Sequence, residues 1–548
     1  MFRLFLLVLL CTPSLALAED ALDRVRARGE LIWGGDAEGG GPYLFADPQD
    51  PGHLLGYDTL LAAELAKTLG VHAHFLQAGW DKLPAFLQAG QIDILTNGYE
   101  WTPERARQLE ASLPYYIYGL RMLVRREETR LHDWPELAGL NGQRKWRAGV
   151  LGDSAAEFWL AKTYPQTVEI VKYEDSTTAM RDVAEGTLDL TVADTPIVQF
   201  FAPRFPQLRP QGAVVGKGYY VVYARKGETA LIQAVNRALL QLMESGQMER
   251  IYAPYQLWNP QMDRELRCTA NVLTHAVLGR DLSPEQVSAI CAHDPPPKLS
   301  PPTHLVADAT LPDDLHGWTV VTRYGPTLLQ AATVTLLLSL LSFPLAVLLG
   351  LLLAIGRAYG PAWLRPLLGV YVEFVRGTPL MLQLFILYFF AVPSLSHLLG
   401  LDLTNPVRGF EIPLKSLLAA VLGLALNYAA YESEIYRAGL SAIAPGQMEA
   451  ALSLGMSRMQ ALRWILLPQA LRITLAPTIN DFIALFKDTS VCSVIAVTEL
   501  TKAYAIHSKN NPQAFVEFAA LASVLYLAMS YPLALAARQL ERKLAREM

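Results

Sequence analysis

The sequence is poor in cysteine and in charged residues, and it has no excess of positive charge. The cysteines are too few and too scattered for a disulfide scaffold or a clustered metal site: Cys11, Cys268, Cys291 and Cys492. Lys and Arg number 46 against 51 Asp and Glu, a net charge of -5, which excludes the basic surface that nucleic-acid binding needs. No G-x-x-x-x-G-K-S/T motif occurs, so the chain lacks the phosphate loop that binds ATP. We therefore expect no metal ion, no cofactor and no nucleic acid partner.

Apolar residues, in contrast, are abundant. Hydrophobic residues make up 52% of the 548 residues and charged residues 18%, which is too apolar for a fully soluble protein of this length. Three stretches without an internal charge, 323–357, 376–402 and 517–538, are each long enough to cross a ~30 Å hydrocarbon core. The sequence therefore predicts a soluble part followed by a part embedded in membrane lipid.

Two further spans are predicted at 414–435 and 471–498, and both contain charged residues. Charges at membrane depth are costly unless they face a bundle interior or a cavity, so we expect these spans to line a path through the bundle. Five spans with an external N-terminal part place the C-terminus in the cytoplasm, and the inner segments of the membrane domain then carry 11 Lys and Arg against 4 in its outer loops. The polar residues assigned to the path are Glu434, Asn480, Lys487 and Asp488.

Residues 1–18 have the pattern of a bacterial signal peptide. Arg3 precedes a Leu-rich uncharged stretch that ends in the A-x-A sequence of residues 16–18, and Glu19 and Asp20 follow. A retained signal anchor is the alternative, but the apolar stretch is shorter than the ~20 residues of a membrane span. We expect the mature chain to begin in the periplasm and to be held in the inner membrane.

Residues 19–258 alternate between predicted strands and helices, which is typical of an α/β domain. Strands are predicted at 29–35, 71–77, 91–97, 147–151, 168–173 and 188–193. A helix is predicted over 57–69, with Asp58 as its N-cap and Gly70 as its stop. His72 and His74 alternate on a predicted strand, which is more typical of a solvated face than of a metal pair.

A linker is predicted over 259–320, ahead of a membrane domain at 321–548. The linker contains Cys268 and Cys291 and a proline-rich run at 295–302. Because such a segment cannot pack as a helix, we expect a semi-rigid spacer. In an oxidising periplasm the two cysteines either pair or remain free thiols, and the sequence leaves both open.

The most specific motif lies in a predicted cytoplasmic loop. Its spacing is E-A-A, three residues, G, nine residues and I-L-L-P, with these marker positions: Glu449, Ala450, Ala451, Gly455 and Pro468. The motif resembles the EAA loop of the transmembrane subunits of bacterial ABC importers. In that family the loop docks in a groove of the ATPase, so the resemblance implies a separate ATPase subunit, with Glu449 at the polar contact. The alternative is an amphipathic hairpin without this partner.

The residues of this loop predict two short helices. Pro445 opens the first, and Gly455 allows a sharp turn. Ser457 and Gln460 form a capping box for the second helix, which Pro468 closes.

Segments around the loop sharpen the resemblance to the polar amino acid permeases of that family, the histidine/glutamine type. They are 373–380 (EFVRGTPL), 434–437 (EIYR), 446–447 (GQ), 467–469 (LPQ) and 487–490 (KDTS). The resemblance covers about residues 324–540. Because one permease half cannot enclose a path alone, it implies a homodimer through the permease domain with two ATPase subunits.

The soluble half resembles the family 3 solute-binding proteins that feed such permeases. The matching segments, in the family's order, are 35–36 (GD), 56–58 (GYD), 80–81 (WD), 102–105 (TPER), 114–116 (PYY) and 245–252 (SGQMERIY). The resemblance covers about residues 28–255. It implies a type II periplasmic binding fold, with two lobes joined by a hinge of two strands and the second lobe at roughly 125–215.

The resemblance also implies roles for residues in the cleft between the lobes. Arg105 stands at the family's carboxylate-binding arginine, and the predicted capping box at Ser154 opens a helix whose N–H groups, with Ala155 first, can face the same carboxylate. Asp194 stands at the ammonium-binding position. The other candidates for contact with an amino acid ligand are Asp36, Tyr43, Trp80, Gly98 and Glu100.

The residues alone are also compatible with purely structural roles. Arg105 could form a surface salt bridge, Ser154 could be a cap only, and Asp194 could be a loop residue. Tyr43 and Trp80 could be core aromatics.

Two departures from the family pattern bear on specificity. Gly39–Gly41 stand where an aromatic residue and a proline are common, and Glu100 stands where a hydroxyl is usual. The predicted cleft then holds three acids, Asp36, Glu100 and Asp194, against one base, Arg105. A cationic side chain offsets part of this excess, so we expect basic amino acids to bind ahead of glutamine.

Together these features predict a fused receptor and permease of an ABC importer of polar amino acids. A ligand-gated channel would interrupt the binding domain with its pore and carry a T-V-G-Y-G-like filter, and the sequence has neither. An enzyme built on the binding fold would need a poised acid in the cleft, and Glu100 is the only unexplained one.

Overall fold

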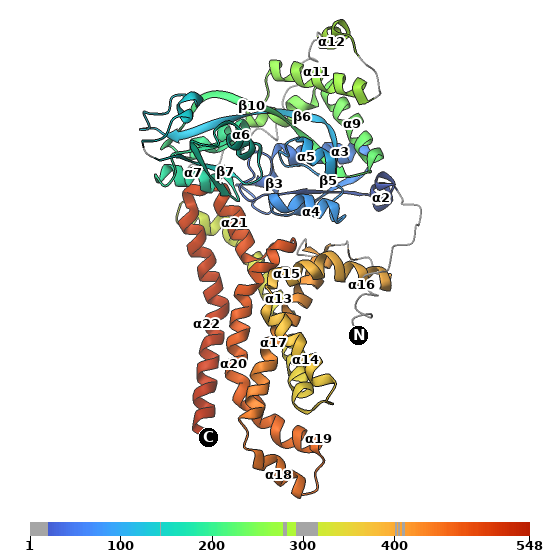
Figure 1. Ribbon diagram of the computed structural model, residues 1–548, viewed down its shortest axis with the longest axis vertical. Helices are drawn as coiled ribbons and strands as arrows, with labels where there is room; N and C mark the ends of the chain where they lie inside the picture. Colours follow the sequence, from blue (N-terminus) through green and yellow to red (C-terminus); the bar gives the residue numbers. More distant parts are fainter. Residues whose placement is uncertain are drawn as a thin grey trace.

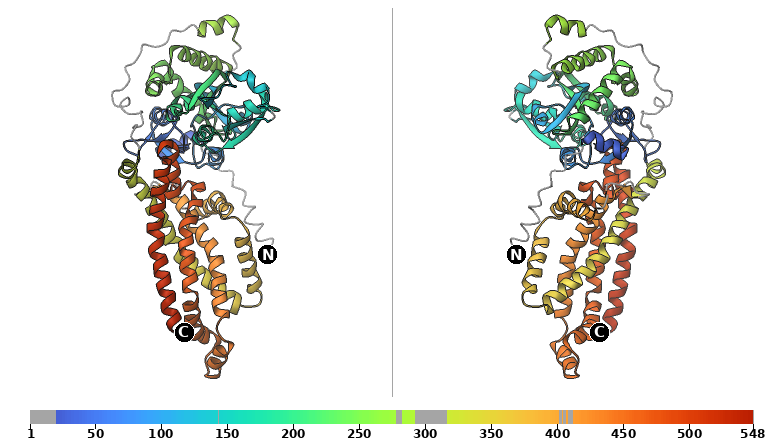
Figure 2. Two further views of the ribbon diagram at one scale, coloured as in Figure 1. Left: turned by 90° about the vertical axis from the view of Figure 1, so that its left-hand side faces the viewer. Right: turned by 90° about the vertical axis from the view of Figure 1, so that its right-hand side faces the viewer.

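The computed structural model describes residues 20–142, 144–277, 282–291, 316–400, 403, 406–407 and 412–547. An α/β domain sits at one end of a long helical domain (Figure 1), and the side views agree (Figure 2). This order agrees with the predicted fold class. The predicted signal peptide and the proline-rich run at 295–302 lie outside the described residues.

An eight-stranded sheet with the order β4-β1-β5-β10-β6-β9-β7-β8 runs through the α/β domain. Its strands are β1 (Glu30–Gly35), β4 (His72–Gln77), β5 (Ile94–Leu95), β6 (Leu109–Arg125), β7 (Trp146–Leu151), β8 (Val168–Tyr173), β9 (Leu190–Asp194) and β10 (Leu208–Arg225). The six predicted strands are confirmed, although β5 is much shorter than expected. Strands β6 and β10 were not predicted from the sequence pattern.

The long strands β6 and β10 pair antiparallel in the middle of the sheet. On one side β4, β1 and β5 are parallel to one another, and on the other side β9, β7 and β8 are parallel. Each side forms a lobe. Lobe 2 consists of the residues between the long strands, 126–207, and lobe 1 of those before β6 and after β10. Two continuous strands therefore connect the lobes.

Helices cover the sheet in both lobes (Figure 1). Those of lobe 1 are α2 (Ala21–Arg28), α3 (Tyr57–Leu69), α4 (Leu83–Gln88), α5 (Pro103–Gln108), α9 (Thr229–Glu244) and α10 (Gln247–Tyr252), and those of lobe 2 are α6 (Ala155–Thr163), α7 (Ser176–Ala184) and α8 (Thr195–Phe201). A small second sheet pairs β2 (Phe45–Ala46) with β3 (Leu54–Leu55) in lobe 1.

Helix α3 has the predicted bounds, and Gly70 ends it in the left-handed conformation. Asp58, however, is not the N-cap, because Gly56 takes that position. The buried carboxylate of Asp58 instead accepts hydrogen bonds of 2.8 Å from the N–H groups of Asn97 and Gly98. Asp58 therefore anchors the turn after β5, which lines the pocket described below.

The first part of the predicted linker is helical. Two helices occupy it: α11 (Pro260–Val277), which packs against β6, and α12 (Pro284–Cys291). The expectation of a spacer without helices is therefore wrong for these residues. Pro260 and Pro284 each stand at the first position of a helix, where a missing N–H costs no intrahelical hydrogen bond. A disulfide joins Cys268 to Cys291 and ties α12 to α11, so the pairing left open by the sequence is present.

The helical domain follows. Its helices are α13 (Trp318–Tyr359), α14 (Leu364–Gly377), α15 (Leu380–Ile386), η5 (Leu387–Ala391), α16 (Val392–Leu399), α17 (Leu414–Ser441), α18 (Pro445–Ser453), α19 (Arg458–Ala461), η6 (Leu462–Leu466), α20 (Leu467–Asp488), η7 (Thr489–Ile495), α21 (Leu500–Asn510) and α22 (Phe515–Glu547). Within the described residues, four helical stretches are long and apolar enough to cross a membrane: Trp318–Tyr359, Leu380–Leu399, Leu414–Ser441 and Pro512–Gln539.

The fifth predicted span, 471–498, corresponds to α20 and is not among these four. Its helix ends at Asp488, and the tighter helix η7 covers Thr489–Ile495 of the remaining predicted stretch. Charged residues keep α20 less apolar than the four, yet it runs along the length of the bundle and contacts α17 and α22 (Figure 1).

The predicted hairpin lies at the end of the bundle farthest from the α/β domain (Figure 1). Helix α18 begins at Pro445, Gly455 adopts a φ of 84°, and Ser457 and Gln460 form the predicted capping box. Pro468 does not close the second helix. The chain continues through the π-helical turn η6 into α20, and Pro468 lies in the first turn of α20, where it is tolerated.

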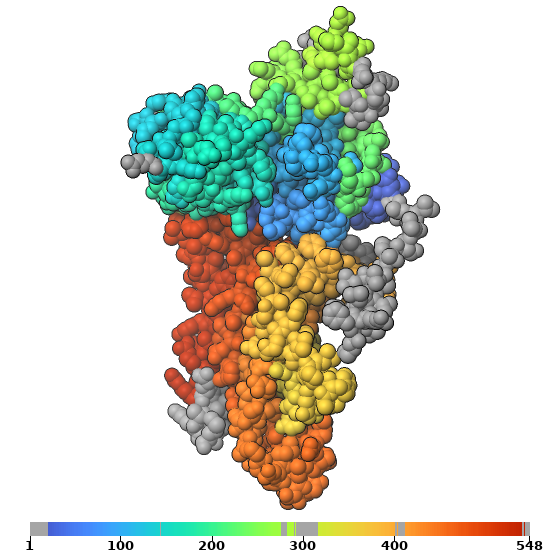
Figure 3. Space-filling view, viewed as in Figure 1, coloured from blue at the N-terminus to red at the C-terminus, as the bar shows by residue number. Residues whose placement is uncertain are grey.

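Both lobes rest on the helical domain (Figure 3). Phe86 of α4 in lobe 1 lies with its ring centroid 5.6 Å from those of Tyr388 and Phe389 in η5. In lobe 2, the guanidinium of Arg181 in α7 lies 4.3 Å from the ring centroid of Phe515 at the start of α22. The α/β domain is therefore seated over the bundle, with α21 beneath it.

Candidate functional site

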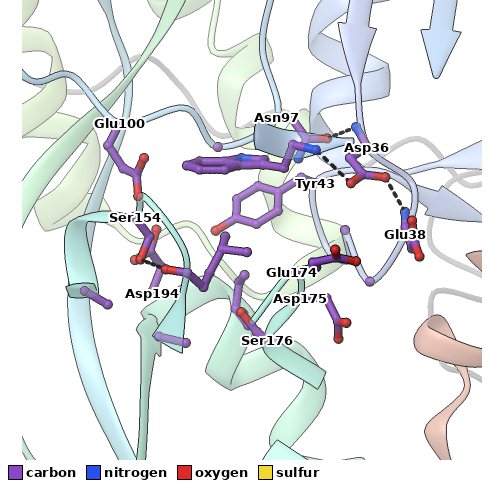
Figure 4. A pocket seen from close by; sticks show the side chains of 18 of the residues that line it. Asp36, Glu38, Tyr43, Asn97, Glu100, Ser154, Glu174, Asp175, Ser176 and Asp194 are labelled. Carbon is purple, nitrogen blue, oxygen red and sulfur yellow. Dashed lines mark hydrogen bonds between the residues drawn. The ribbon is translucent and has the colours of Figure 1, made fainter. Parts of the chain in front are cut away.

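A pocket lies between the two lobes (Figure 4). It encloses about 580 Å³, part of which is open to solvent. The acidic residues that line it come from both lobes: Asp36, Glu38, Glu100, Glu174, Asp175 and Asp194. None of the described residues that line it is Lys, Arg or His. The lining of the pocket is therefore rich in carboxylates.

Asp36 follows β1 and organises the wall that lobe 1 contributes. Its carboxylate accepts hydrogen bonds from the N–H of Glu38 (3.0 Å), from Nε2 of Gln77 (2.7 Å) and from the N–H of Trp80 (2.9 Å). These bonds hold Trp80, whose ring stacks on Tyr99 at a centroid distance of 4.5 Å. Burial raises the pKa of the Asp36 carboxyl above its ordinary value.

Hydroxyl groups connect Asp194 at the end of β9 to the opposite wall. The hydroxyl of Tyr220 donates to the Asp194 carboxylate, and its oxygen lies 2.7 Å from the hydroxyl oxygen of Tyr43. Gly98 passes so close to Tyr43 that a Cβ would lie 2.5 Å from the ring. Burial and the nearby Glu100 raise the pKa of Asp194 well above its ordinary value, because both disfavour its ionised form.

Glu100 and Arg105 form an ion pair that closes the cleft. Nη1 of Arg105 lies 2.7 Å from Oε2 of Glu100, and Oε1 of Glu100 accepts a hydrogen bond of 3.0 Å from the N–H of Ala155. Nη2 of Arg105 donates to the carbonyl of Asp153 at 2.8 Å. Because Asp153 and Ala155 belong to lobe 2, these bonds cross the cleft. The Glu100 carboxylate thus engages both donors predicted for the carboxylate of a ligand.

Ser154 caps α6 with an Oγ···N distance of 3.4 Å to Glu157. The second half of the predicted capping box does not form, because the Glu157 carboxylate accepts from the N–H of Asp153 at 2.8 Å instead of that of Ser154. The Ser154 hydroxyl donates to the carbonyl of Leu151. The first N–H of α6 still faces the cleft, where it meets Glu100.

Sequence reasoning missed Glu38, Glu174 and Asp175 as lining residues. Asp175 caps α7 by accepting a 2.8 Å hydrogen bond from the N–H of Thr178, so an Asp before an amphipathic helix was a usable signal. Glu38 offered none, because it stands in a glycine-rich loop. A Cβ on Gly39, at a φ of 72°, would lie 3.3 Å from that of Asp175, so glycine allows this loop to approach lobe 2.

The residues predicted for the path divide between α17 and α20. Glu434 of α17 pairs with Arg357 of α13 and, at 2.7 Å, with Arg437. This residue therefore joins helices within the chain. On α20, Asp488 accepts a 2.7 Å hydrogen bond from the hydroxyl of Tyr428.

Asn480 and Lys487 lie on the exposed side of α20. They are seven positions apart, which is close to two helical turns, so they share one face of the helix. Polar residues at membrane depth are costly when they face lipid. This face therefore favours a further protein surface or a water-filled path.

The hairpin presents an open apolar surface around the motif. Glu449 and Ala450 are exposed, whereas Ala451 packs inward. The exposed apolar side chains of this region are Leu452, Leu454, Met459 and Trp464, with Leu454 85% exposed. An apolar patch of this kind, next to a carboxylate, is typical of a protein-binding surface.

Metal-ligating residues are not clustered in the described part of the chain. No group of three or more His, Cys, Asp or Glu side chains there could hold a metal ion. His72 on β4 is exposed, and the thiol of Cys492 is buried.

Comparison with known proteins matches each half of the chain to a family. Residues 35–257 match the bacterial extracellular solute-binding proteins, family 3, and residues 346–546 match the binding-protein-dependent transport system inner membrane component. The L-cystine transport system permease protein TcyB of Bacillus subtilis (strain 168) is 36% identical over 231 residues, which cover 42% of this chain and 92% of TcyB. The glutamine transport system permease protein GlnP of Escherichia coli (strain K12) is 34% identical over 227 residues, 41% of this chain and 97% of GlnP.

Among solved structures, the chain resembles an ancestral amino acid-binding protein that is described as a precursor of cyclohexadienyl dehydratase. The two share 28% sequence identity, the match covers 43% of this chain and 98% of the solved chain, and the TM-score is 0.39. TcyB and GlnP are both permease proteins of amino acid transport systems. The chain therefore belongs to the inner membrane components of amino acid ABC importers, and it carries a family 3 solute-binding domain in the same polypeptide.

Proposed function

We propose that this chain is the substrate-binding and permease subunit of an importer for polar amino acids, with a preference for basic side chains, and that a separate subunit hydrolyses ATP. The observation that carries the proposal is the carboxylate-rich pocket between the lobes, in a chain that continues into an amino acid permease. A cationic ligand offsets part of the buried negative charge, whereas a neutral side chain leaves it uncompensated.

The carboxylate of the amino acid binds Arg105 and the N–H of Ala155. Support comes from the Glu100 carboxylate, which lies 2.7 Å and 3.0 Å from these donors, so their geometry suits such a group. An arriving ligand displaces Glu100, whose charge then becomes available to a ligand cation. Asp194 accepts the α-ammonium, because a cation beside this carboxyl offsets the burial and the Glu100 charge that disfavour its ionised form.

The side chain of the ligand extends from Asp194 toward Asp36. Tyr43 and Trp80 line this part of the pocket and form its aromatic walls, while Gly98 leaves room for Tyr43. The Asp36 carboxylate, although engaged by three donors, retains acceptor capacity for a distal amine or guanidinium.

Competition binding to the full chain tests this specificity. We expect arginine, lysine, ornithine or histidine to bind more tightly than glutamine or glutamate, and Glu100→Gln to reduce that preference by roughly 10-fold, since one buried charge is lost. Glu104→Gln is the matched control, because Glu104 is an exposed glutamate on α5 that pairs with Arg107 outside the pocket. Tighter binding of glutamine or glutamate than of every basic amino acid, or an unchanged preference in Glu100→Gln, would contradict the assignment.

The proposed arrangement in the inner membrane has five crossings. α20 supplies the one that composition alone does not identify, and its position beside α17 and α22 supports this. The α/β domain is then periplasmic, and the hairpin of α18 and α19 and the C-terminal end of α22 are cytoplasmic. The proposed domains are a signal peptide at 1–18, a type II binding domain at 19–258, a connecting segment at 259–320 and the permease at 321–548.

The hairpin binds the ATPase, with Glu449 as the polar contact and the exposed apolar residues around Gly455 as the surrounding surface. Because two permease copies are needed to enclose a path, two ATPase subunits complete the assembly. The exposed face of α20 that carries Asn480 and Lys487 supports a homodimer, since a second copy would cover it. Asp488 of α20 and Glu434 of α17 lie on the two helices assigned to the path through the permease.

A further inference from the structure

Helix α21 of the permease lies against the mouth of the ligand pocket. It contacts β2 of lobe 1 and α7 of lobe 2, and it lies directly beneath α7 in the view of Figure 1. Two of its lysines point toward the α/β domain. The ammonium of Lys502 pairs with Glu38, and that of Lys509 lies 2.7 Å from Oε1 of Glu38 and 3.1 Å from Oδ2 of Asp175.

One ammonium group therefore bridges both lobes. Glu38 belongs to the glycine-rich loop of lobe 1, and Asp175 caps α7 in lobe 2. Lys509 can reach both carboxylates only while the lobes are close together. The pairs are shielded from solvent, since the side chains of Lys502 and Lys509 are 11% and 19% exposed and that of Asp175 is 4% exposed. Shielded pairs are screened little by salt and depend strongly on both partners.

The same two carboxylates line the ligand pocket. Glu38 and Asp175 stand with Asp36 at the end of the pocket nearest α21 (Figure 4). Burial raises the pKa of Glu38, but Lys502 and Lys509 outweigh it, so the pKa lies below its ordinary value. The same balance, with Lys509 as the opposing charge, lowers the pKa of Asp175. In the docked arrangement these carboxylates already have cationic partners.

We propose that Lys502 and Lys509 compete with the cationic side chain of the ligand for the carboxylates at the pocket mouth, so that docking on the permease loosens a basic ligand. The inference rests on the proposed function, because it needs a ligand with a cationic side chain. Before docking, Glu38 and Asp175 add to the attraction for that side chain. On docking, the two lysines take over these carboxylates and the ligand loses part of its binding energy where it must leave for the membrane path.

Other contacts hold α21 and α22 to the binding domain independently of the lysines. Asn510 donates to the carbonyl of Ala37 at 2.5 Å, and Arg181 lies against the ring of Phe515. Neutral replacements of the lysines therefore leave these contacts between the two domains in place. Methionine keeps an unbranched apolar side chain, one heavy atom shorter than that of lysine, and removes the ammonium group.

The test measures binding of L-arginine and L-glutamine to the full chain in lipid nanodiscs without nucleotide. In the double variant Lys502→Met, Lys509→Met we expect the affinity for L-arginine to rise by roughly 10-fold and that for L-glutamine to change by less than about threefold. Lys226→Met is the matched control, because Lys226 pairs with Glu110 at 3.4 Å away from the pocket and should leave both affinities unchanged.

Three results would overturn the proposal. The first is an affinity for L-arginine that is unchanged or lower in the double variant, when that variant unfolds at the wild-type temperature; the lysines then do not compete with the ligand. An equal rise for both ligands shows a general effect of undocking. A wild-type chain and double variant that bind L-glutamine but not L-arginine refute the cationic preference of the proposed function and, with it, this inference.

The single variant Lys509→Arg, which keeps the charge, should retain the wild-type affinity for L-arginine within about threefold.

Discussion

Replacing Glu449 with lysine should abolish ligand-stimulated ATP hydrolysis by the chain reconstituted with its ATPase. Glu449 is exposed on α18 at the end of the bundle farthest from the binding domain, beside the apolar side chains of the hairpin. A reversed charge in the centre of a docking surface faces an unmatched partner, which costs several kcal/mol. The measurement is the rate of phosphate release in nanodiscs with and without amino acid.

The affinity of the binding domain for its ligand should remain unchanged in Glu449→Lys, because the hairpin lies at the end of the bundle farthest from the binding domain (Figure 1). Glu285→Lys is a suitable control, since Glu285 is an exposed residue of α12 on the binding-domain side. Normal stimulation in Glu449→Lys would contradict the assignment of the hairpin.

Arg105→Ala should weaken ligand binding by about 30-fold or more, equivalent to at least ~2 kcal/mol. The substitution leaves the ligand carboxylate without its guanidinium partner in a closed cleft. The loss should lie toward the lower end of the usual range of roughly 2 to 5 kcal/mol for such pairs, because Arg105 already pairs with Glu100 before the ligand arrives. Calorimetry on the full chain measures it.

A double-mutant cycle separates the loss of the ligand contact from the loss of the Glu100 contact. Arg105→Ala also removes the guanidinium partner of the buried Glu100 carboxylate, which still accepts from the N–H of Ala155. Comparing this single variant with the double variant that also carries Glu100→Gln measures the effect of the unpaired Glu100. A loss below threefold in Arg105→Ala would mean that the arginine only closes the cleft and does not bind ligand.

The fold was predictable where local patterns carry the information. The short parallel strands β1, β4, β7, β8 and β9 appear as short runs, either apolar or alternating between polar and apolar residues, between helices, and α3 has the bounds that its sequence indicates. Strands β6 and β10 were not predictable in this way, because they contain Pro114, Pro210 and several glycines and change partners between the two lobes. Helix α11 was missed because the expectation for the whole linker rested on the proline-rich run at 295–302, whereas Pro260 stands at the first position of its helix, where proline is favoured.

The candidate site was predictable in composition but not in pairing. Sequence reasoning named Arg105, Glu100 and Ala155, yet their mutual contact depends on closure of the two lobes and has no local signature. Glu38 and Asp175 acquire their partners from α21, more than 300 residues away in the sequence. Such contacts arise only when the α/β domain docks on the helical domain.

ATP-driven uptake into proteoliposomes that hold the chain and its ATPase tests the central claim most directly. The account predicts that radiolabelled L-arginine accumulates only with ATP on the side of the hairpin, that excess lysine or ornithine suppresses its uptake more than glutamine does, and that Glu449→Lys abolishes it. Absence of ATP-dependent accumulation for all twenty amino acids, with the chain and its ATPase both folded and assembled, would contradict it.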